Sequence, residues 1–178
     1  MLFHDMAAKG IQGRIAARCA SIPDRVAAAA EIASKPGQWL VWCGLNEESA
    51  SLARAIPGAV EISGRDSYTE KKAAILGFQN GTIRVLLTKL KIAGYGLNLQ
   101  HCHQMLFVGI GDSYEQYYQG VRRCWRFGQT EPVDVHIIVS EAETGVVANV
   151  RRKEQAAIEM SRELLSELRD FEREEIAS

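Results

Sequence analysis

The stretch QWLVWCG, residues 38–44, is apolar from Trp39 to Cys43 and ends in glycine. An apolar run of this length without alternation is typical of a strand that is covered on both faces. A second run of the same character, IRVLLT, occupies residues 83–88. Strands of this kind belong to parallel sheets covered by helices, so the two runs indicate an α/β fold.

Segments with strand and helix patterns alternate around these two runs. Asn46 is a good N-cap for a helix through Ile56, and a Ser67–Glu70 capping box precedes a helix that ends near Asn80. A further helix begins at Asp112 or Ser113 and continues to about Phe127. The remaining strands are expected at 59–62, 104–109 and 133–139. The alternation predicts an open, mostly parallel sheet with helices on both faces.

Helical segments flank this region on both sides. Residues 1–35 are rich in alanine, with a helix start at Pro23, and Pro36-Gly37 ends the segment. The last segment, about 143–176, reads as one long helix whose apolar stripe includes Ile158, Leu165, Leu168 and Phe171. It is either a solvated helix packed by one face or a helix that binds a partner or another domain. The expected organisation is an N-terminal helical segment (1–36), an α/β domain (37–141) and a C-terminal helix (142–178).

Composition and charge exclude several classes of protein. The 178 residues are 47% hydrophobic and 24% charged, which excludes a disordered chain, a collagen-like chain and a small disulfide scaffold. The net charge of -1 excludes a uniformly basic surface for nucleic acid. Segment 65–91 is nevertheless rich in Lys and Arg, whereas the tail is acidic. A local basic patch therefore remains compatible with the sequence.

The cysteines and the absence of long apolar runs predict a soluble cytoplasmic protein. An even count could form two disulfides, but no C-x-x-C pair occurs and the domain is large enough to need no covalent links, which favours reduced thiols. No run approaches the roughly 20 apolar residues of a membrane span, so no membrane is expected as a partner. The His101-Cys102-His103 tract lacks a second pair of ligands, so no metal site is predicted.

Two motifs contain residues that are suited to binding a ligand. TKLKIAGYGLN, residues 88–98, follows a buried strand, and its glycines would let the backbone approach an anionic ligand. QGVRRCWRFGQ, residues 119–129, places Arg123 and Arg126 on one face of a helix, with Arg122 turned away by about 100°. Two guanidinium groups on one face suit a polyphosphate. The alternative is a salt-bridged surface helix, for which Trp125 and Phe127 would be unusual.

Together these motifs resemble the C-terminal RecA-like lobe of superfamily-two DEAD/DEAH helicases, specifically the Swi/Snf-like group. That group has a G-x-G-L-N-L loop and then Q-x-x-x-R-x-x-R-x-G-Q before a last core strand, and both patterns stand here in order over about residues 38–140. The amino-acid sequences of the two segments are similar to those of the subgroup carried by phages and prophages. The fold implied is RecA-like, as in P-loop NTPases.

The resemblance implies roles for individual residues. ATP with Mg²⁺ would occupy a cleft between two lobes, where Arg123 and Arg126 would act as arginine fingers on the terminal phosphates. The other positions implied at the nucleotide are Gln119, Gly94, Gly96 and Asn98. The positions implied at the backbone of DNA, with RNA left open, are Gly44, Asn46, Ser63, Gly64, Thr88, Lys89 and Lys91. Lys89 stands where the group often has a small hydroxyl residue, and it would contact phosphate as a point charge.

The first lobe of such a helicase has no counterpart in this sequence. There is no G-x-x-x-x-G-K-[ST] and no Asp-Glu box to hold Mg²⁺ and the β-phosphate. The chain alone is therefore expected to be inactive, as part of a longer helicase or as one half of a split enzyme that needs an N-terminal lobe. The alternatives are a nonenzymatic nucleic-acid-binding module derived from such a lobe and an unrelated flavodoxin-like or Rossmann-type enzyme.

Overall fold

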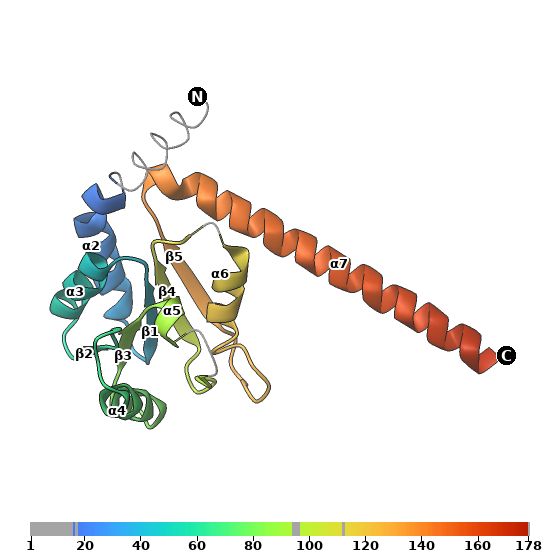
Figure 1. Ribbon diagram of the computed structural model, residues 1–178, viewed down its shortest axis with the longest axis horizontal. Helices are drawn as coiled ribbons and strands as arrows, with labels where there is room; N and C mark the ends of the chain where they lie inside the picture. Colours follow the sequence, from blue (N-terminus) through green and yellow to red (C-terminus); the bar gives the residue numbers. More distant parts are fainter. Residues whose placement is uncertain (1–15, 17, 94–96, 112, 178) are drawn as a thin grey trace.

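Five strands form one parallel sheet in the computed structural model, which describes residues 16, 18–93, 97–111 and 113–177 (Figure 1). The strands are β1 (Trp39–Cys43), β2 (Ala59–Glu61), β3 (Val85–Thr88), β4 (Gln104–Val108) and β5 (Asp134–Ile138). Their order is β2-β3-β1-β4-β5, and every neighbouring pair is parallel. The predicted α/β fold is confirmed, with strand ends within two residues of those expected.

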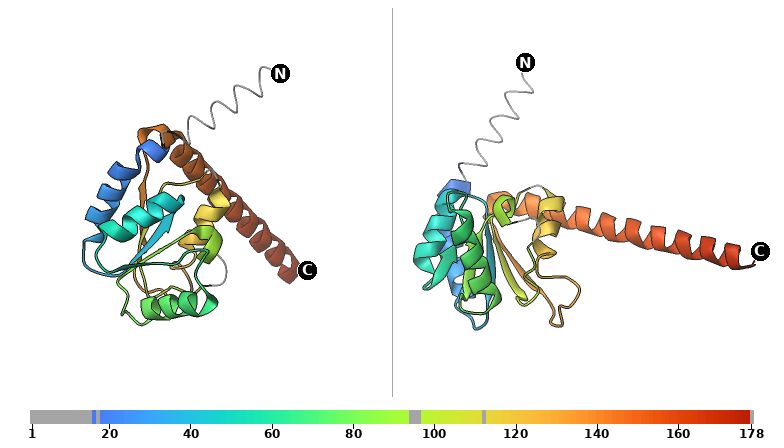
Figure 2. Two further views of the ribbon diagram at one scale, coloured as in Figure 1. Left: turned by 60° about the vertical axis from the view of Figure 1, so that its left-hand side comes forward. Right: turned by 60° about the horizontal axis from the view of Figure 1, so that its bottom comes forward.

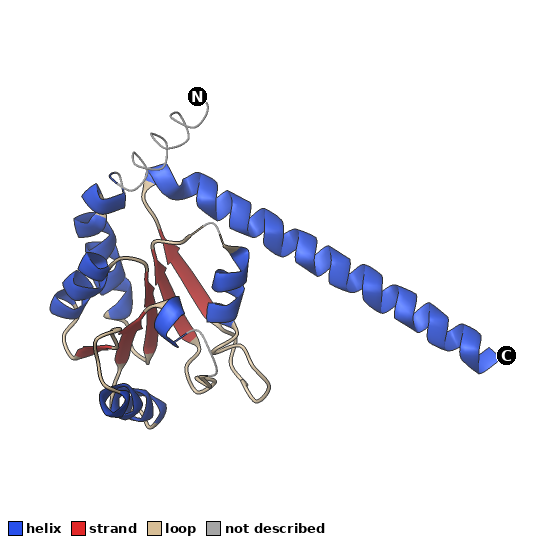
Figure 3. Cartoon of the chain, viewed as in Figure 1, coloured by secondary structure: helices blue, strands red, loops and turns tan. Residues whose placement is uncertain are grey.

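Helices cover both faces of the sheet, as Figures 1 and 3 show. They are α2 (Ile22–Ala33), α3 (Asn46–Ala55), α4 (Tyr68–Gln79), α5 (Leu90–Ala93), α6 (Tyr114–Val121), the 3-10 helix η1 (Glu141–Glu143) and α7 (Thr144–Ala177). Helices α2 and α3 pack on one face, and α4, α5 and α6 supply side chains to the core on the other. The two layers are best seen in Figure 2.

The central strand β1 explains why its sequence shows no alternation. Val41 and Cys43 belong to the core under α2 and α3, whereas Leu40 and Trp42 belong to the core on the opposite face. All five β1 residues are buried. A strand buried on both faces needs apolar residues at consecutive positions, and this is the pattern that the sequence shows.

Two predicted helix limits need correction. The N-cap of α3 is Leu45 rather than Asn46, because the buried Glu48 carboxylate reaches back and accepts the N–H of Leu45 at 3.4 Å, in addition to that of Gly44 at 2.8 Å. Helix α6 ends at Val121 rather than near Phe127. Its ladder stops there because the carbonyl of Arg123 accepts the N–H of Leu99 at 2.9 Å instead of a helical N–H.

The long helix α7 leaves the domain after its first turns (Figure 1). Val150 is 1% exposed, but Ile158, Leu165 and Leu168 are 41%, 56% and 57% exposed. The predicted apolar stripe is therefore largely exposed along the described part of this helix, and the side chain of Phe171 lies outside the described part. None of the helices described is both long and apolar enough to cross a membrane.

Candidate functional site

The two sequence motifs meet at the backbone carbonyl of Leu97. Arg126 donates to this oxygen through Nη1 at 3.2 Å, and Arg123 donates to it through Nη1 at 3.4 Å. The shared acceptor, rather than a shared helix face, brings the two guanidinium groups together, because both residues lie beyond the end of α6. Leu97, which is described, is thus directly connected to the arginine segment.

Arg123 is held in a fixed geometry by Gln119. Its Nε donates to the Gln119 carbonyl at 3.1 Å, and its Nη2 donates to the Gln119 side-chain oxygen at 3.0 Å. Arg123 is only 8% exposed. Burial, and secondarily the charge of Arg126, lower the pKa of Arg123 below its ordinary value. Two cations held together in partly desolvated surroundings favour an anion as the third partner.

Arg122 is separate from this pair. Its guanidinium lies 5.2 Å from the Trp125 ring and 6.0 Å from the Tyr118 ring, within the range of cation–π contacts. Arg122 also borders a depression of about 410 Å³ whose described lining is Tyr118, Gln119, Arg122, Arg123 and Arg126. No described carboxylate forms an ion pair with any of the three arginines. The interpretation of a salt-bridged surface helix therefore finds no support in the described residues.

The loop before β4 is fixed by amide side chains. The backbone oxygen of Asn98 accepts from Gln79 at 2.8 Å, and its side-chain oxygen accepts the N–H of Gln100 at 3.2 Å. Gln129 donates to the Gln100 carbonyl at 2.8 Å and to the Cys102 carbonyl at 3.2 Å. These bonds anchor the end of the arginine segment to the same loop. The predicted residues Gly94 and Gly96 lie outside the described residues.

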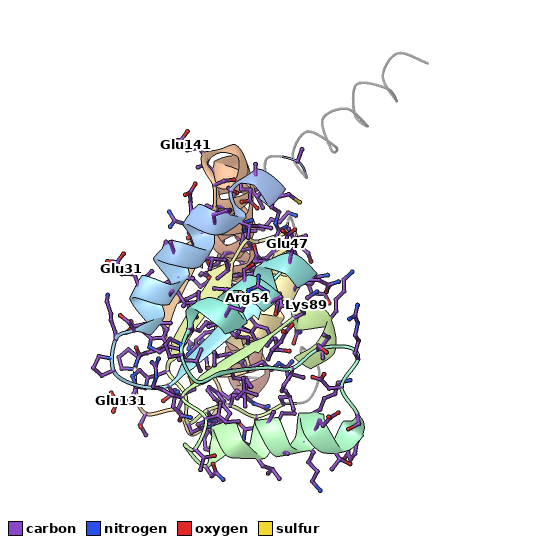
Figure 4. The ribbon with its side chains drawn as sticks, turned by 90° about the vertical axis from the view of Figure 1, so that its left-hand side faces the viewer. Glu31, Glu47, Arg54, Lys89, Glu131 and Glu141 are labelled. Carbon is purple, nitrogen blue, oxygen red and sulfur yellow. The ribbon has the colours of Figure 1, made fainter. Side chains whose placement is uncertain are left out.

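A second group of predicted residues lies at the carboxyl ends of the strands. After β1 the chain turns to α3 on one face, and after β4 it turns to α6 on the other, so the two connections diverge. Such a switch point is where open α/β sheets bind ligands. A cavity of about 340 Å³ opens here, and Gly44, Lys89, Lys91 and Gly109 are among its lining residues. Lys89 also donates to the Asn46 side chain, and Figure 4 shows it beside α3.

The remaining predicted nucleic-acid positions differ in exposure. Ser63 is held by Asp66, which accepts from its N–H at 2.7 Å and from its hydroxyl at 2.8 Å. Gly64 is exposed beside it. Thr88 is fully buried, and its hydroxyl donates to the Ile62 carbonyl at 3.3 Å. The side chain of Thr88 is thus committed to the sheet, and we exclude it from the interface.

Sequence reasoning missed a buried charge network next to this cavity. Arg25 forms an ion pair with Glu48 and lies 3.9 Å from Glu143, which also pairs with Arg18 at 3.3 Å. Arg25 is 2% exposed, and Glu48 is fully buried. The signal was the position of Arg25 in the apolar stripe of α2, next to Val26. A charge at a core position implies a buried partner.

Comparison with known proteins identifies the family. The model of the helicase conserved C-terminal domain matches residues 24–128, which is more than half of the chain. The chain belongs to this family. It is a helicase C-terminal lobe with a RecA-like fold.

Solved structures share the fold at low sequence identity. The C-terminal domain of the DEAD-box protein Dbp5 superposes with a TM-score of 0.61 at 13% identity over 74% of this chain and 78% of that one. The C-terminal part of the Fun30 ATPase domain gives 0.58 at 16% identity over 64% of this chain. This helicase lobe covers only 39% of that Fun30 structure. No curated protein sequence matches the chain.

Proposed function

We propose that this helicase lobe is the second of the two lobes of an ATP-dependent nucleic-acid helicase or translocase of the Swi/Snf-like group, of the kind carried by phages and prophages. The observation that supports this proposal most is the bonding of Arg123 and Arg126 to one carbonyl, that of Leu97. It joins the arginine segment to Leu97, which follows the glycines in the sequence. A movement of either would therefore be transmitted to the other.

At the nucleotide, Arg123 and Arg126 would act as arginine fingers. The pair fits a polyphosphate because no described carboxylate neutralises it. Gln119 would orient Arg123, and the loop of Gly94, Gly96 and Asn98 would follow the state of the nucleotide. Among the described residues no cluster of three or more His, Cys, Asp or Glu side chains could hold a metal ion. We assign Mg²⁺, which would neutralise phosphate charge, to the first lobe, in the same or a separate chain.

At the carboxyl edge of the sheet, the lobe would grip the backbone of a nucleic-acid strand, with DNA as the first candidate and RNA left open. The proposed contacts are Gly44, Asn46, Ser63, Gly64, Lys89 and Lys91. Two lysines, a side-chain amide and exposed loops offer contacts to phosphate that do not depend on base sequence. This binding should therefore weaken steeply with salt.

The experiment joins this lobe to a P-loop-bearing first lobe, taken from the same polypeptide or from the adjoining reading frame. ATP hydrolysis is measured for each part and for the combination, with and without single-stranded DNA. We expect activity only in the combination. Arg123→Ala should lower it on the order of 10³-fold, as the loss of an arginine finger does. Arg122→Ala is the matched control, since Arg122 contacts aromatic rings rather than Leu97.

Two results would contradict the proposal. Substantial ATPase activity of this chain alone would show that it does not depend on a first lobe. Equal activity of the Arg123→Ala and Arg122→Ala combinations would favour the nonenzymatic nucleic-acid-binding module instead, because the arginine pair would then have no catalytic role.

A further inference from the structure

Arg18 lies at the switch-point cavity, although it precedes the segment that the family model matches, residues 24–128. It belongs to the helical turns before α2, and its side chain is 20% exposed. Arg18 is not among the motif residues that were predicted at this edge of the sheet. Its presence adds a guanidinium group to a cavity that is otherwise lined by the ends of β1 and β4, by Lys89 and the start of α5, and by the start of α6.

Two glycines leave the space that Arg18 occupies. A Cβ atom on either Gly44 or Gly109 would overlap the Nη2 atom of Arg18. Gly44 follows β1 and Gly109 follows β4, so the guanidinium lies over the backbone at the point where the two connections diverge. Gly109 also has a φ of +67°, which glycine adopts without strain. Arg18 is thus placed at the crevice where α/β sheets receive ligands.

The charge around this cavity is positive. Arg18 and Arg25 are matched by the two buried carboxylates of Glu48 and Glu143. Lys89 and Lys91 line the cavity as well, and none of its described lining residues is Asp or Glu. Because the network of two arginines and two glutamates is neutral, the lysines give the cavity a net positive charge. An anion is the ligand that this charge favours.

We propose that Arg18 binds a backbone phosphate of the nucleic-acid strand in this cavity, together with Lys89 and Lys91. This inference rests on the proposed function and extends it to a residue outside the matched domain. The segment before α2 thereby becomes part of the nucleic-acid interface.

The test is the binding of a fluorescently labelled single-stranded oligonucleotide by the whole chain, measured by anisotropy over a series of salt concentrations. Arg18→Gln should weaken binding about tenfold and reduce the slope of log K against log salt by about 0.7, the loss of one phosphate contact on a single strand. Arg18→Lys should keep the slope. Arg54→Gln is the control of equal charge change, because Arg54 is exposed on α3 (Figure 4) and its hydrogen-bond acceptor among the described residues is Ser51.

The outcomes distinguish this inference from the proposed function. If Lys89→Gln and Lys91→Gln weaken binding while Arg18→Gln matches Arg54→Gln, Arg18 has no role and the proposed interface stands. If Arg18→Gln and Arg18→Lys lose binding equally with an unchanged salt slope, Arg18 acts only on the fold and the inference is overturned. If the unchanged chain binds neither DNA nor RNA at low salt, the proposed interface itself fails.

Discussion

Replacing Glu48 with glutamine would remove the charge from a carboxylate that is fully buried. This carboxylate accepts hydrogen bonds from Arg25 and from the N–H of Gly44 at 2.8 Å. Glutamine fills the same volume but replaces one acceptor oxygen with a donor amide. That amide would face either the Arg25 guanidinium or the Gly44 N–H, and both are donors themselves.

The expected cost follows from the burial of the pair. Loss of one partner of a buried ion pair costs about 3–5 kcal/mol. The lower value applies here, because Glu143 lies 3.9 Å from the Nε atom of Arg25 and compensates part of the charge. With an m-value of about 2 kcal/mol/M, a loss of about 3 kcal/mol lowers the urea midpoint by about 1.5 M.

The assay is urea unfolding of the purified chain, with Glu47→Gln as the matched control. Glu47 is the neighbouring residue and is exposed, so its replacement should cost less than about 0.5 kcal/mol. The double variant Arg25→Met, Glu48→Gln should cost clearly less than the sum of the single variants, since the two groups interact directly. A midpoint shift below about 0.5 M for Glu48→Gln, or additive single costs, would refute the reasoning.

Three further predictions concern packing, thiol reactivity and pH. Gly120→Val should lower the free energy of unfolding by about 1–3 kcal/mol in thermal melts, because a Cβ atom added at Gly120 would lie only 2.7 Å from Leu90 Cδ2. Gly111→Ala is the control, since a Cβ atom there would meet open space. Equal costs for the two variants would contradict this prediction. In the native chain only the exposed Cys19 should react with an aromatic disulfide reagent. Burial and the charge of Glu48 raise the pKa of Cys43 to about 12, and Cys102 and Cys124 are buried. A Cys19→Ser chain that still reacts in its native state would disprove this prediction. Hydrogen bonds from Ser63 lower the pKa of Asp66, so its stabilisation is present above the unfolded carboxyl pKa of about 3.9 and disappears as the pH falls through the folded value. The difference in melting temperature between the unchanged chain and Asp66→Asn should therefore be present at neutral pH and vanish in acid, and a difference that does not depend on pH would exclude this titration.

Much of the fold could be predicted because its signals are local. The apolar run at 39–43, the Ser67–Glu70 capping box and the Pro36-Gly37 break depend only on neighbouring residues and on burial of each strand. The end of α6 could not be predicted in this way. It depends on a hydrogen bond between Leu99 and Arg123, which are far apart in the sequence.

The candidate site likewise has some features that the local sequence determines and others that depend on distant contacts. The sequence by itself determined the residue types and their order: two arginines after a glycine loop, and lysines after buried strands. The tertiary structure alone showed that Arg123 and Arg126 share the Leu97 carbonyl, that Thr88 is buried, and that Arg18 lies over Gly44 and Gly109. These facts depend on which distant segments meet, and no local pattern encodes that. Spacing placed the arginines on a common helix face, whereas the structure joins them through a carbonyl beyond the end of the helix.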